Sequence, residues 1–558
     1  MDDSKTQSER DAALGQRLDG SRRRFVLGTA AAIGLGAGLA ACGGGGTGHA
    51  DEERFGYGVA SGDPLPDRVI VWTRVNNVAG ATDVQWEVAA DANFATIVRS
   101  GSVTTDESRD YTVKVDVTGL QPGTAYAYRF RQGGETSRTG FTKTLPVGAV
   151  AQVKLAVFSC AAYPLGQFHV YADAAARGGF DAAVFLGDYI YETGLSDAEQ
   201  TAAAGLGRKV DPQGELRGLA DYRHRYARYH TDSDLRALRA TMPIIAAWDD
   251  HEIANGAWRG GDDEETGASF LARRDAAVQA FHEWLPTRVG SDPLQIYRSF
   301  DFGNLASLHM LETRLLGRDA PITRAQYLAG AAGDPNRQLL GTAQMDWLTG
   351  RLQASRATWQ VLGSQVLMAP MQIPLSVFDN FSVAGIDEFL HALDTPEASR
   401  TDRDRALLAQ PRIGLELDNW DAFAVQREQI LATAHALDKN LIVLAGDSHN
   451  GWASDLKDAA GDSVGVEFAG PSVTSTGLDQ SHSEISPPYL ANSLMRMIPT
   501  LRYAETSHRG YVSVTLTPGA AQADWIFVSD VLRNSYNVFP GAHLRTLPGS
   551  ANRVLQAA

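Results

Sequence analysis

The spacing of apolar residues along the chain changes near residue 147. Between residues 55 and 144, apolar and polar residues alternate in short runs, among them 69–75, 84–88, 111–117 and 126–130. A period of two places one face of a strand in the core and the other face toward solvent. Short alternating strands at this spacing favour an antiparallel β-sandwich of about 90 residues.

After residue 154 the apolar residues form short continuous runs, separated by longer and partly helical stretches. These runs are 155–158, 182–186, 243–247, 305–308, 360–362 and 441–445. Continuous runs of this length predict strands that are buried on both faces. We therefore expect a mixed α+β and α/β chain whose second domain has a β-sandwich core flanked by helices. A hairpin is expected at Pro518-Gly519, and residues 371–425 are expected to form loops and helices over the site.

These patterns divide the body of the chain into two domains. Within the first, the segment LQPGTAY (120–126) resembles the tyrosine corner of fibronectin type III domains. We assign a fibronectin III-like sandwich to residues 53–147, with a structural or substrate-shaping role. A larger domain follows at 148–540, and residues 541–558 are expected to form a C-terminal tail.

The first 42 residues have the features of an export signal. Arg22 and Arg23 directly precede a run without charge from residue 28 to 41, which is shorter than the roughly 20 residues of a membrane span. The arginine pair favours the twin-arginine export machinery, and a basic patch before a buried helix is the alternative. Cys42 ends a lipobox-like segment and is a candidate lipid anchor, with the Gly-rich stretch 43–52 as a tether. An ordinary cleavage site is the other interpretation. We expect the protein in the periplasm or cell envelope.

Charge and cysteine content narrow the classes of function. The net charge of −16 argues against non-specific nucleic-acid binding, which needs a basic surface. It is compatible with an anionic substrate, because bound metal ions reverse the sign of a local field. Cys42 and Cys160 are the two cysteines of the chain, which therefore has no disulfide framework.

Four of the apolar runs end in potential metal ligands or acid–base groups. The four ends are FSC (158–160), GDYIYE (187–192), WDDHE (248–252) and GDSHN (446–450). In sheets of this type the strand ends converge on one crevice, which is the usual ligand site. A single Gly-Asp is a common turn, but four polar strand ends predict a metal site.

The spacing of these groups suggests their chemistry. Asp188 and Tyr191 offer a carboxylate and a phenol oxygen; an ionised phenol binds well to a hard trivalent ion such as Fe³⁺. Asp188 is short and central, which suits a ligand that bridges two ions. Asp447 and His449 lie on one side of an extended segment. Cys160 is a candidate thiolate ligand, with a buried inert thiol as the alternative.

Several separate motifs, in the right order along nearly the whole chain, resemble the PhoD-type alkaline phosphatase family. They are FGYGVASGDP (55–64), GDYIYE (187–192), WDDHE (248–252), ETR (312–314), RQLLG (337–341), GDSH (446–449) and RGY (509–511), besides the twin-arginine signal. The resemblance implies a fibronectin-like N-terminal domain, a calcineurin-like metallophosphatase domain, and a site that holds Fe³⁺ and Ca²⁺. It also implies Fe³⁺ ligation by Cys160, Asp188 and Tyr191, with a contribution from the Asp447/His449 segment.

The same resemblance implies the calcium ligands. Asp188 would bridge to Ca²⁺, and Asp250 with Asp447 or His449 would complete that site. Glu192 and Asn255 are weaker candidates for a further calcium.

Two residues are predicted to act on the substrate. A phosphate ester repels hydroxide, so the site must neutralise the phosphoryl oxygens and make a nucleophile; a metal cluster does both. His251 is the candidate proton donor to the leaving oxygen, a role worth about 10²–10⁴-fold, or else it orients Asp250. Arg314 either binds a phosphate oxygen with its planar fork or forms a buried salt bridge. Glu312 departs from the family, which more often has Asp there.

Three functions fit this sequence. The first is an exported, metal-dependent phosphatase of phosphate mono- and diesters, which we expect to be a monomer. The second is a phospholipase D-like phosphodiesterase of the same family. The third, of a different class, is a metal-binding surface or adhesion lipoprotein, suggested by the fibronectin-like domain and the acidic charge.

Overall fold

A computed structural model describes residue 50 and residues 52–558 of the chain. The predicted twin-arginine signal, the lipobox-like segment with Cys42 and most of the tether lie outside the described residues. Across the described residues, no helix combines the length and the apolar composition needed to cross a bilayer.

The N-terminal region is a β-sandwich, as its alternating pattern predicts. One layer has the strand order β1-β2-β5 and the other has the order β4-β3-β6-β7, with β8 paired to β6. These strands are β1 (Val59–Leu65), β2 (Arg68–Arg74), β3 (Thr82–Ala89), β4 (Ile97–Thr105), β5 (Thr112–Thr118), β6 (Ala125–Gln132), β7 (Glu135–Thr136) and β8 (Gly140–Lys143). The inward-facing apolar residues of both layers form one core. The tyrosine corner is present, since the Gln121 N–H donates to the Tyr126 hydroxyl at 2.9 Å.

The remainder of the chain is built on two large sheets that pack face to face. The first has ten strands in the order β24-β23-β22-β21-β9-β10-β11-β1-β2-β5, and the second has seven in the order β12-β13-β14-β17-β19-β18-β20. The strands not yet given are β9 (Val153–Phe158), β10 (Ala182–Phe185), β11 (Pro243–Ala246), β12 (Arg298–Phe302), β13 (Ala306–Met310), β14 (Trp359–Ser364), β17 (Asn440–Ala445), β18 (Gly451–Lys457), β19 (Ser463–Ala469), β20 (Leu501–Glu505), β21 (Arg509–Leu516), β22 (Ala521–Val528), β23 (Val538–Thr546) and β24 (Gln556–Ala557). Each of the six continuous apolar runs forms one of these strands, and β21 and β22 form the expected hairpin.

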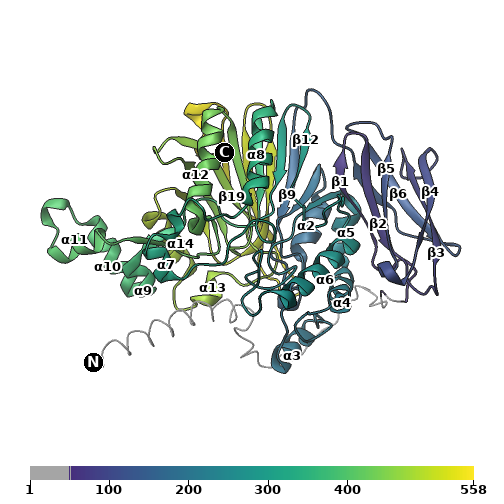
Figure 1. Cartoon of the computed structure of the whole chain (residues 1–558), viewed down its shortest axis with the longest axis horizontal. Coiled ribbons are helices and arrows are strands. Elements are labelled where there is room, and N and C mark those ends of the chain that lie inside the picture. Colours follow the sequence, from purple (N-terminus) through teal and green to yellow (C-terminus); the bar gives the residue numbers. More distant parts are fainter. Residues whose placement is uncertain (1–49, 51) are drawn as a thin grey trace.

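Helices cover the outer face of each sheet, which gives four layers (Figure 1). Against the ten-stranded sheet pack α2 (His169–Arg177), α4 (Leu219–His230), α5 (Ser233–Thr241) and α6 (Ala268–Trp284), with α3 (Asp197–Gly205) beyond them. Against the seven-stranded sheet pack α8 (Gly341–Ala354) and α12 (Ala424–Ala436). The core between the sheets is apolar, with Val157, Val184 and Ile442 among its fully buried side chains.

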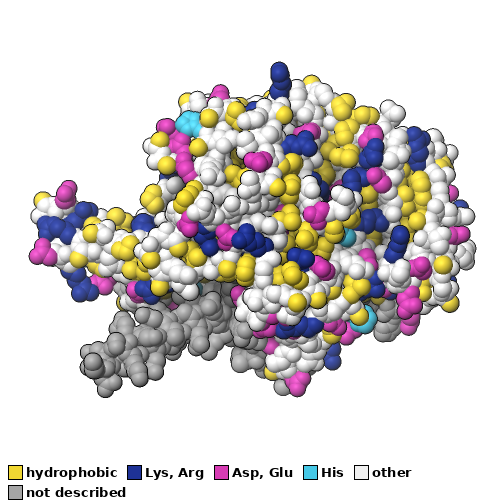
Figure 2. All heavy atoms as spheres, viewed as in Figure 1, with side chains coloured by type: hydrophobic (Ala, Val, Ile, Leu, Met, Phe, Trp, Pro, Cys, Tyr) yellow, Lys and Arg dark blue, Asp and Glu magenta, His cyan; other side chains and the backbone are white. Residues whose placement is uncertain are grey.

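The segment expected to form loops and helices over the site does contain short helices and strands, and part of it projects from the body. Its elements are β15 (Gln372–Pro374), α9 (Leu375–Asp379), α10 (Val383–Asp394), α11 (Asp402–Leu408) and β16 (Arg412–Gly414). Figure 1 shows α10 and α11 at the far left, near α7 (Arg324–Leu328) and α14 (Pro487–Met497), with α13 (Leu478–Ser481) below. On the face in Figure 2, this projection carries side chains of both charge signs.

Two expected boundaries do not coincide with breaks in the structure. Strand β1 pairs in parallel with β11, with Ser61 opposite Pro243, so one layer of the sandwich continues the ten-stranded sheet. Residues 541–558, expected as a tail, instead complete β23 and supply β24 at the opposite edge. Strand β24 pairs with β23 and is the last strand at that edge.

Candidate metal centre

The predicted ligands lie where parallel strands of both sheets end. Cys160 follows β9, Asp188 follows β10 and Asp250 follows β11 in the first sheet. Asp447 and His449 follow β17 in the second sheet, where β13, β14, β17 and β19 also run parallel. The carboxyl ends of these strands therefore meet at one crevice, as expected for such sheets.

The backbone is turned sharply at these positions. Cys160, Asp188, Asp447 and His449 have φ values of 60°, 54°, 61° and 60°, in the left-handed region. That conformation costs roughly 1–2 kcal/mol for a residue with a side chain. Gly187 has a φ of 105°, and a Cβ there would lie 2.3 Å from Cβ of Asp249. Such strain gathers at functional sites, where the surrounding fold holds a side chain in one direction.

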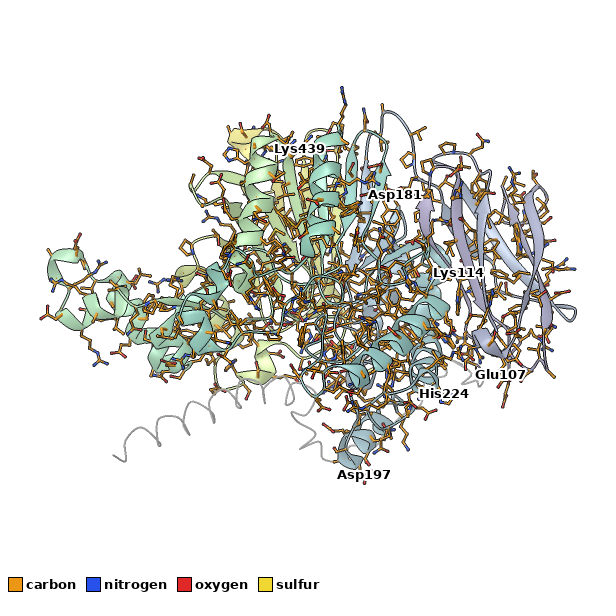
Figure 3. All side chains as sticks on the ribbon, in the orientation of Figure 1. Glu107, Lys114, Asp181, Asp197, His224 and Lys439 are labelled. Atoms are coloured by element: carbon orange, nitrogen blue, oxygen red, sulfur yellow. The ribbon has the colours of Figure 1, made fainter. Side chains whose placement is uncertain are left out.

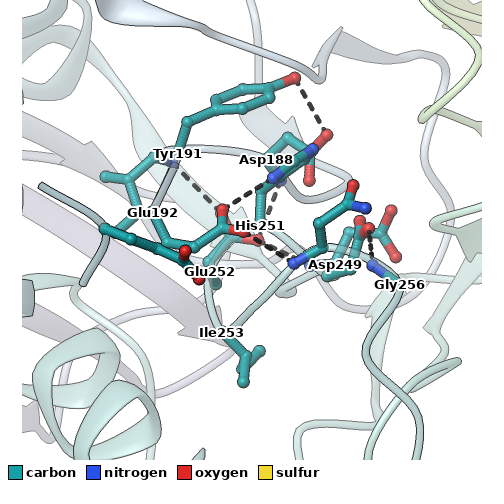
Figure 4. A network of polar contacts seen from close by, with 12 residues as sticks. Asp188, Tyr191, Glu192, Asp249, His251, Glu252, Ile253 and Gly256 are labelled. Carbon is teal, nitrogen blue, oxygen red and sulfur yellow. Dashed lines mark hydrogen bonds and ion pairs between the residues drawn. The ribbon is translucent and has the colours of Figure 1, made fainter. Parts of the chain in front are cut away.

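Asp188 lies at the centre of the cluster. Its ligand atom belongs to three groups whose donor atoms all lie within 4.8 Å of one another: with Cys160 and His449, with Asp250 and His251, and with Asp249, Asp250 and Asp447. The Tyr191 hydroxyl donates to Asp188 Oδ2 at 3.1 Å (Figure 4) and lies 3.3 Å from His449 Nε2. The geometry suits Asp188 as a ligand shared between two ions.

The donor set fits metal ions. Oδ1 of Asp188 is buried and has no hydrogen-bond partner in the described part of the chain. Burial, reinforced by the carboxylates of Asp250 and Asp249, holds the pKa of Asp188 well above its usual value. Burial and the Asp188 charge also hold the pKa values of the Cys160 thiol and the Tyr191 phenol well above normal. A cation would stabilise all of these groups in their charged forms.

Each histidine of the site is oriented through one ring nitrogen. His449 Nδ1 donates to the Thr476 carbonyl at 2.7 Å, which directs Nε2 toward Tyr191. His251 Nδ1 donates to Glu192 Oε2 at 2.7 Å. Burial lowers the pKa of His251, but the carboxylates of Glu192 and others outweigh it and raise that pKa well above normal.

Glu192 and Asn255 lie together beside His251. The Asn255 N–H donates to Glu192 Oε1 at 2.7 Å, so both oxygens of Glu192 accept hydrogen bonds. Asn255 also donates through Nδ2 to Asp263 at 2.6 Å and lines the cleft. Their role as ligands of a further calcium stays a prediction.

Arg314 lies in the interior of the protein, next to the predicted metal ligands Asp250 and Asp447. Its side chain is fully buried and forms a fork–fork pair with Asp249, with Nη2 to Oδ2 at 2.9 Å. Nη1 donates to Asp418 at 2.6 Å, while Asp250 and Asp447 lie at 3.4 and 4.0 Å. Of the two roles expected for Arg314, this geometry favours the buried salt bridge.

The sequence did not indicate several residues that hold the ligands in place. Ser475 donates to the Tyr191 hydroxyl at 2.6 Å, from a loop that follows β19. Glu252 accepts from the backbone N–H groups of Asp188 and Asp249, at 2.9 and 2.7 Å, and so ties two strand ends together. The mainly apolar run 464–469 is followed by Gly470-Pro471 and then by polar residues, as at the other strand ends. This pattern could have indicated from the sequence that Ser475 lies at the site.

A small cleft opens over these groups. It is lined by Ala162, Leu165, Tyr191, Asp250, His251, Asn255, Glu416, Asp447, Ser448, His449, Asn450, Ser475, Thr476 and Leu478. A phosphate group in this cleft would face the carboxylates of the site, so metal ions are required to bind an anion there.

Comparison with known proteins identifies the family. A family model described as PhoD-like phosphatase matches residues 155–525, and one described as its N-terminal domain matches residues 41–146. Alkaline phosphatase D of Bacillus subtilis (strain 168) is 34% identical over 492 residues, which cover 84% of this chain and 77% of that protein. The solved structure of PhoD is 31% identical and has a TM-score of 0.74, with 90% of this chain and 92% of that chain covered. The resemblance inferred from the motifs is thus confirmed, and an enzyme is favoured over an adhesion module. The chain belongs to the PhoD-like phosphatase family and is a metal-dependent hydrolase of phosphate esters.

Proposed function

We propose that this protein hydrolyses phosphate monoesters and diesters with a centre of Fe³⁺ and Ca²⁺. The observation that carries the proposal is the position of Asp188 between a mixed set of sulfur, nitrogen and oxygen donors and a set of carboxylates. On one side lie the Cys160 thiol, the Tyr191 phenol and the His449 imidazole. On the other side lie the carboxylates of Asp250 and Asp447.

The two donor sets suit different ions. A thiolate, a phenolate and an imidazole are ligands for iron, whereas an all-oxygen set suits calcium. Cys160, Tyr191, His449 and Asp188 would hold Fe³⁺, and Asp188, Asp250 and Asp447 would hold Ca²⁺. Bound cations would neutralise the phosphoryl oxygens and lower the pKa of a water molecule.

His251 is suited to protonate the leaving oxygen. Glu192 fixes the ring through Nδ1, so Nε2 is the nitrogen that releases a proton into the cleft. The ring also packs on Tyr191, with centroids 4.1 Å apart, which limits its rotation. The hydrogen bond from Nδ1 to the Glu192 carboxylate favours the protonated ring, which suits His251 as a proton donor.

The test of the iron assignment is spectroscopic. Fe³⁺ bound to a thiolate and a phenolate gives a visible charge-transfer band, which Zn²⁺ or Ca²⁺ alone would not give. Cys160→Ala and Tyr191→Phe should each weaken the band, lower the iron content and reduce turnover. Tyr189→Phe is the matched control, because Tyr189 hydrogen-bonds to His230 rather than to the ligands. Active wild type without iron would refute the metal identity, and an unchanged Cys160→Ala spectrum would make Cys160 a core thiol.

Substrate choice separates this proposal from a phospholipase D-like activity. Rates on p-nitrophenyl phosphate, its bis ester and phosphatidylcholine should be compared with the metal-replete protein. Faster release from the two nitrophenyl esters supports the phosphatase, and a preference for phosphatidylcholine supports the phospholipase.

We also propose export by the twin-arginine route and a lipid anchor at Cys42. The support is the Arg22-Arg23 pair before an uncharged run, and the small residues that precede Cys42. Changing both arginines to Lys should leave the precursor in the cytoplasm, and normal export would contradict this route. Cys42→Ser should release the protein from the membrane fraction; unchanged membrane association would argue against the anchor.

A further inference from the structure

Arg239 of α5 is a buried cation without a counter-charge from residues 52–558. Its side chain has no exposed surface. Nη1 donates to the Tyr57 carbonyl at 3.3 Å, whereas Nε and Nη2 have no hydrogen-bond partner among the described residues. Among those residues, no carboxylate forms an ion pair with it, and the nearby charged side chain that acts on it is another cation, Arg236.

Two other buried arginines are compensated by carboxylates, whereas Arg225 is held by the backbone carbonyls of Tyr191 and Pro212. Arg208 pairs with Asp232, and Arg318 pairs with Asp418. Removing an ion from water costs several kcal/mol after relaxation, and a paired carboxylate offsets that cost. Arg239 does not have this compensation from the described residues.

Several further buried polar groups lie near Arg239. Within the described part of the chain, the Trp284 indole N–H and His230 Nδ1 have no hydrogen-bond partner, and the Ser61 and Tyr128 hydroxyls interact with each other. Arg239 Cζ lies 4.6 Å from the ring of Trp72, which in turn contacts the rings of His230 and Trp284. We call this set the Arg239 cluster: Ser61, Trp72, Tyr128, His230, Arg239 and Trp284.

None of these neighbours supplies a negative charge. Burial holds the pKa of Tyr128 well above its usual value, so the phenol is neutral. Burial, together with the charge of Arg239, lowers the pKa of His230, so the imidazole is neutral as well. The cation–π contact with Trp72 offsets only part of the cost of burying the charge. The cluster therefore carries one uncompensated positive charge.

We propose that the Arg239 cluster binds a small inorganic monoanion of the halide class, with chloride as the physiological candidate. The available groups are mainly donors: the guanidinium N–H groups, the indole N–H and the hydroxyls. A water molecule would satisfy donors but would leave the charge uncompensated. A halide supplies the single negative charge that is needed.

The position of the cluster indicates what the anion does. Ser61, Trp72 and Tyr128 come from the N-terminal sandwich, whereas Arg239 and Trp284 come from helices α5 and α6. Ser61 is also one of the two residues that pair β1 with β11. A bound anion would therefore stabilise the junction between the sandwich and the phosphatase body.

The direct test is anomalous diffraction from crystals of the whole protein grown in sodium bromide. We expect a bromide peak within hydrogen-bonding distance of Nε or Nη2 of Arg239. Density at this position without anomalous signal, as for a water molecule, would overturn the proposal.

A test in solution compares thermal unfolding in sodium chloride and in sodium gluconate at equal ionic strength. Chloride should raise the unfolding temperature of the wild type by about 2–4 °C, the shift expected for modest stabilisation of a protein of this size. Arg239→Met should abolish the difference. Arg223→Met is the matched control, because Arg223 also joins the sandwich to α6 but is paired with Glu283; it should retain the chloride effect. Equal unfolding temperatures of the wild type in both salts would contradict the proposal, and the bromide experiment decides if Arg239→Met does not fold.

Discussion

Arg314 and Arg239 are both fully buried arginines, but their surroundings are opposite in charge. Arg314 lies within 4.0 Å of four carboxylates, those of Asp249, Asp250, Asp418 and Asp447. Arg239 lies among aromatic rings and hydroxyls, without a carboxylate that pairs with it in the described part of the chain.

The comparison shows that the charges buried around a site determine the sign of the ion that the site binds. Around Arg314 one cation does not balance the surrounding carboxylates, and the surplus negative charge attracts metal ions. Around Arg239 the surplus is positive, and it attracts an anion. The same side chain thus contributes to two sites of opposite preference, because burial makes the local sum of charges decisive.

The largest effect should come from removing the central carboxylate of the negative region. Asp188→Asn removes the charge that both donor sets share, so kcat/KM should fall by roughly 10³-fold or more, equivalent to several kcal/mol of transition-state stabilisation. Metal content measured by elemental analysis should fall as well. Asp173→Asn is the control, since Asp173 binds Arg177 and Tyr511 away from the site. Full metal content and rate in Asp188→Asn would refute the shared-ligand role.

The next effect concerns stability and compares the two arginines directly. Arg314→Met leaves Asp249 buried without its ion-pair partner and Asp418 with Arg318 alone, so the free energy of unfolding should fall by about 3–5 kcal/mol. Arg239→Met removes an uncompensated charge, so in gluconate its stability should equal or exceed that of the wild type. Urea unfolding of both variants measures the contrast. Equal losses of stability would remove the distinction between the two regions.

The third effect appears only as a dependence on pH and concerns Lys114, a cation that, unlike Arg239, can lose its proton. Lys114 lies at the junction of β5 and α6 (Figure 3), beside a cleft of about 660 Å³, and donates to the Thr287 carbonyl at 2.9 Å. Burial lowers its pKa to about 7, despite the opposing effect of Asp63 and Glu283.

The sign of the resulting pH dependence follows from proton binding. Between pH 7 and about pH 10 the unfolded chain holds a proton on Lys114 that the folded protein lacks, so stability rises with pH by up to about 1.4 kcal/mol per unit. Lys114→Met should lack this rise and should gain most, relative to the wild type, below pH 7. Urea unfolding from pH 6 to pH 10 tests it, with Lys143→Met as the control, because Lys143 is paired with Asp181. An identical pH slope in wild type and Lys114→Met would contradict the lowered pKa.

Local pattern was sufficient to predict the strands and the meeting of their ends. Cys160, Asp188 and Asp447 each follow a continuous apolar run, so their convergence follows from the parallel sheets alone. Ser475 and Glu252 act by contacts with distant backbone or side chains, and residue type alone does not reveal such partners. The pairing of β1 with β11 was missed for the same reason, because it joins strands that are far apart in the sequence.

The pairing of β1 with β11 determines when the ten-stranded sheet can be completed during synthesis. Strands β1, β2 and β5 leave the ribosome long before β11 has been synthesised, so the edge of β1 stays open until the chain reaches residue 246. Contacts of such long range slow folding, and they delay the moment at which an export system could accept a finished molecule. Cleavage of the chain after residue 147 would therefore not give two complete domains. Each fragment would expose a strand edge, that of β1 or that of β11, which is hydrogen-bonded in the intact protein.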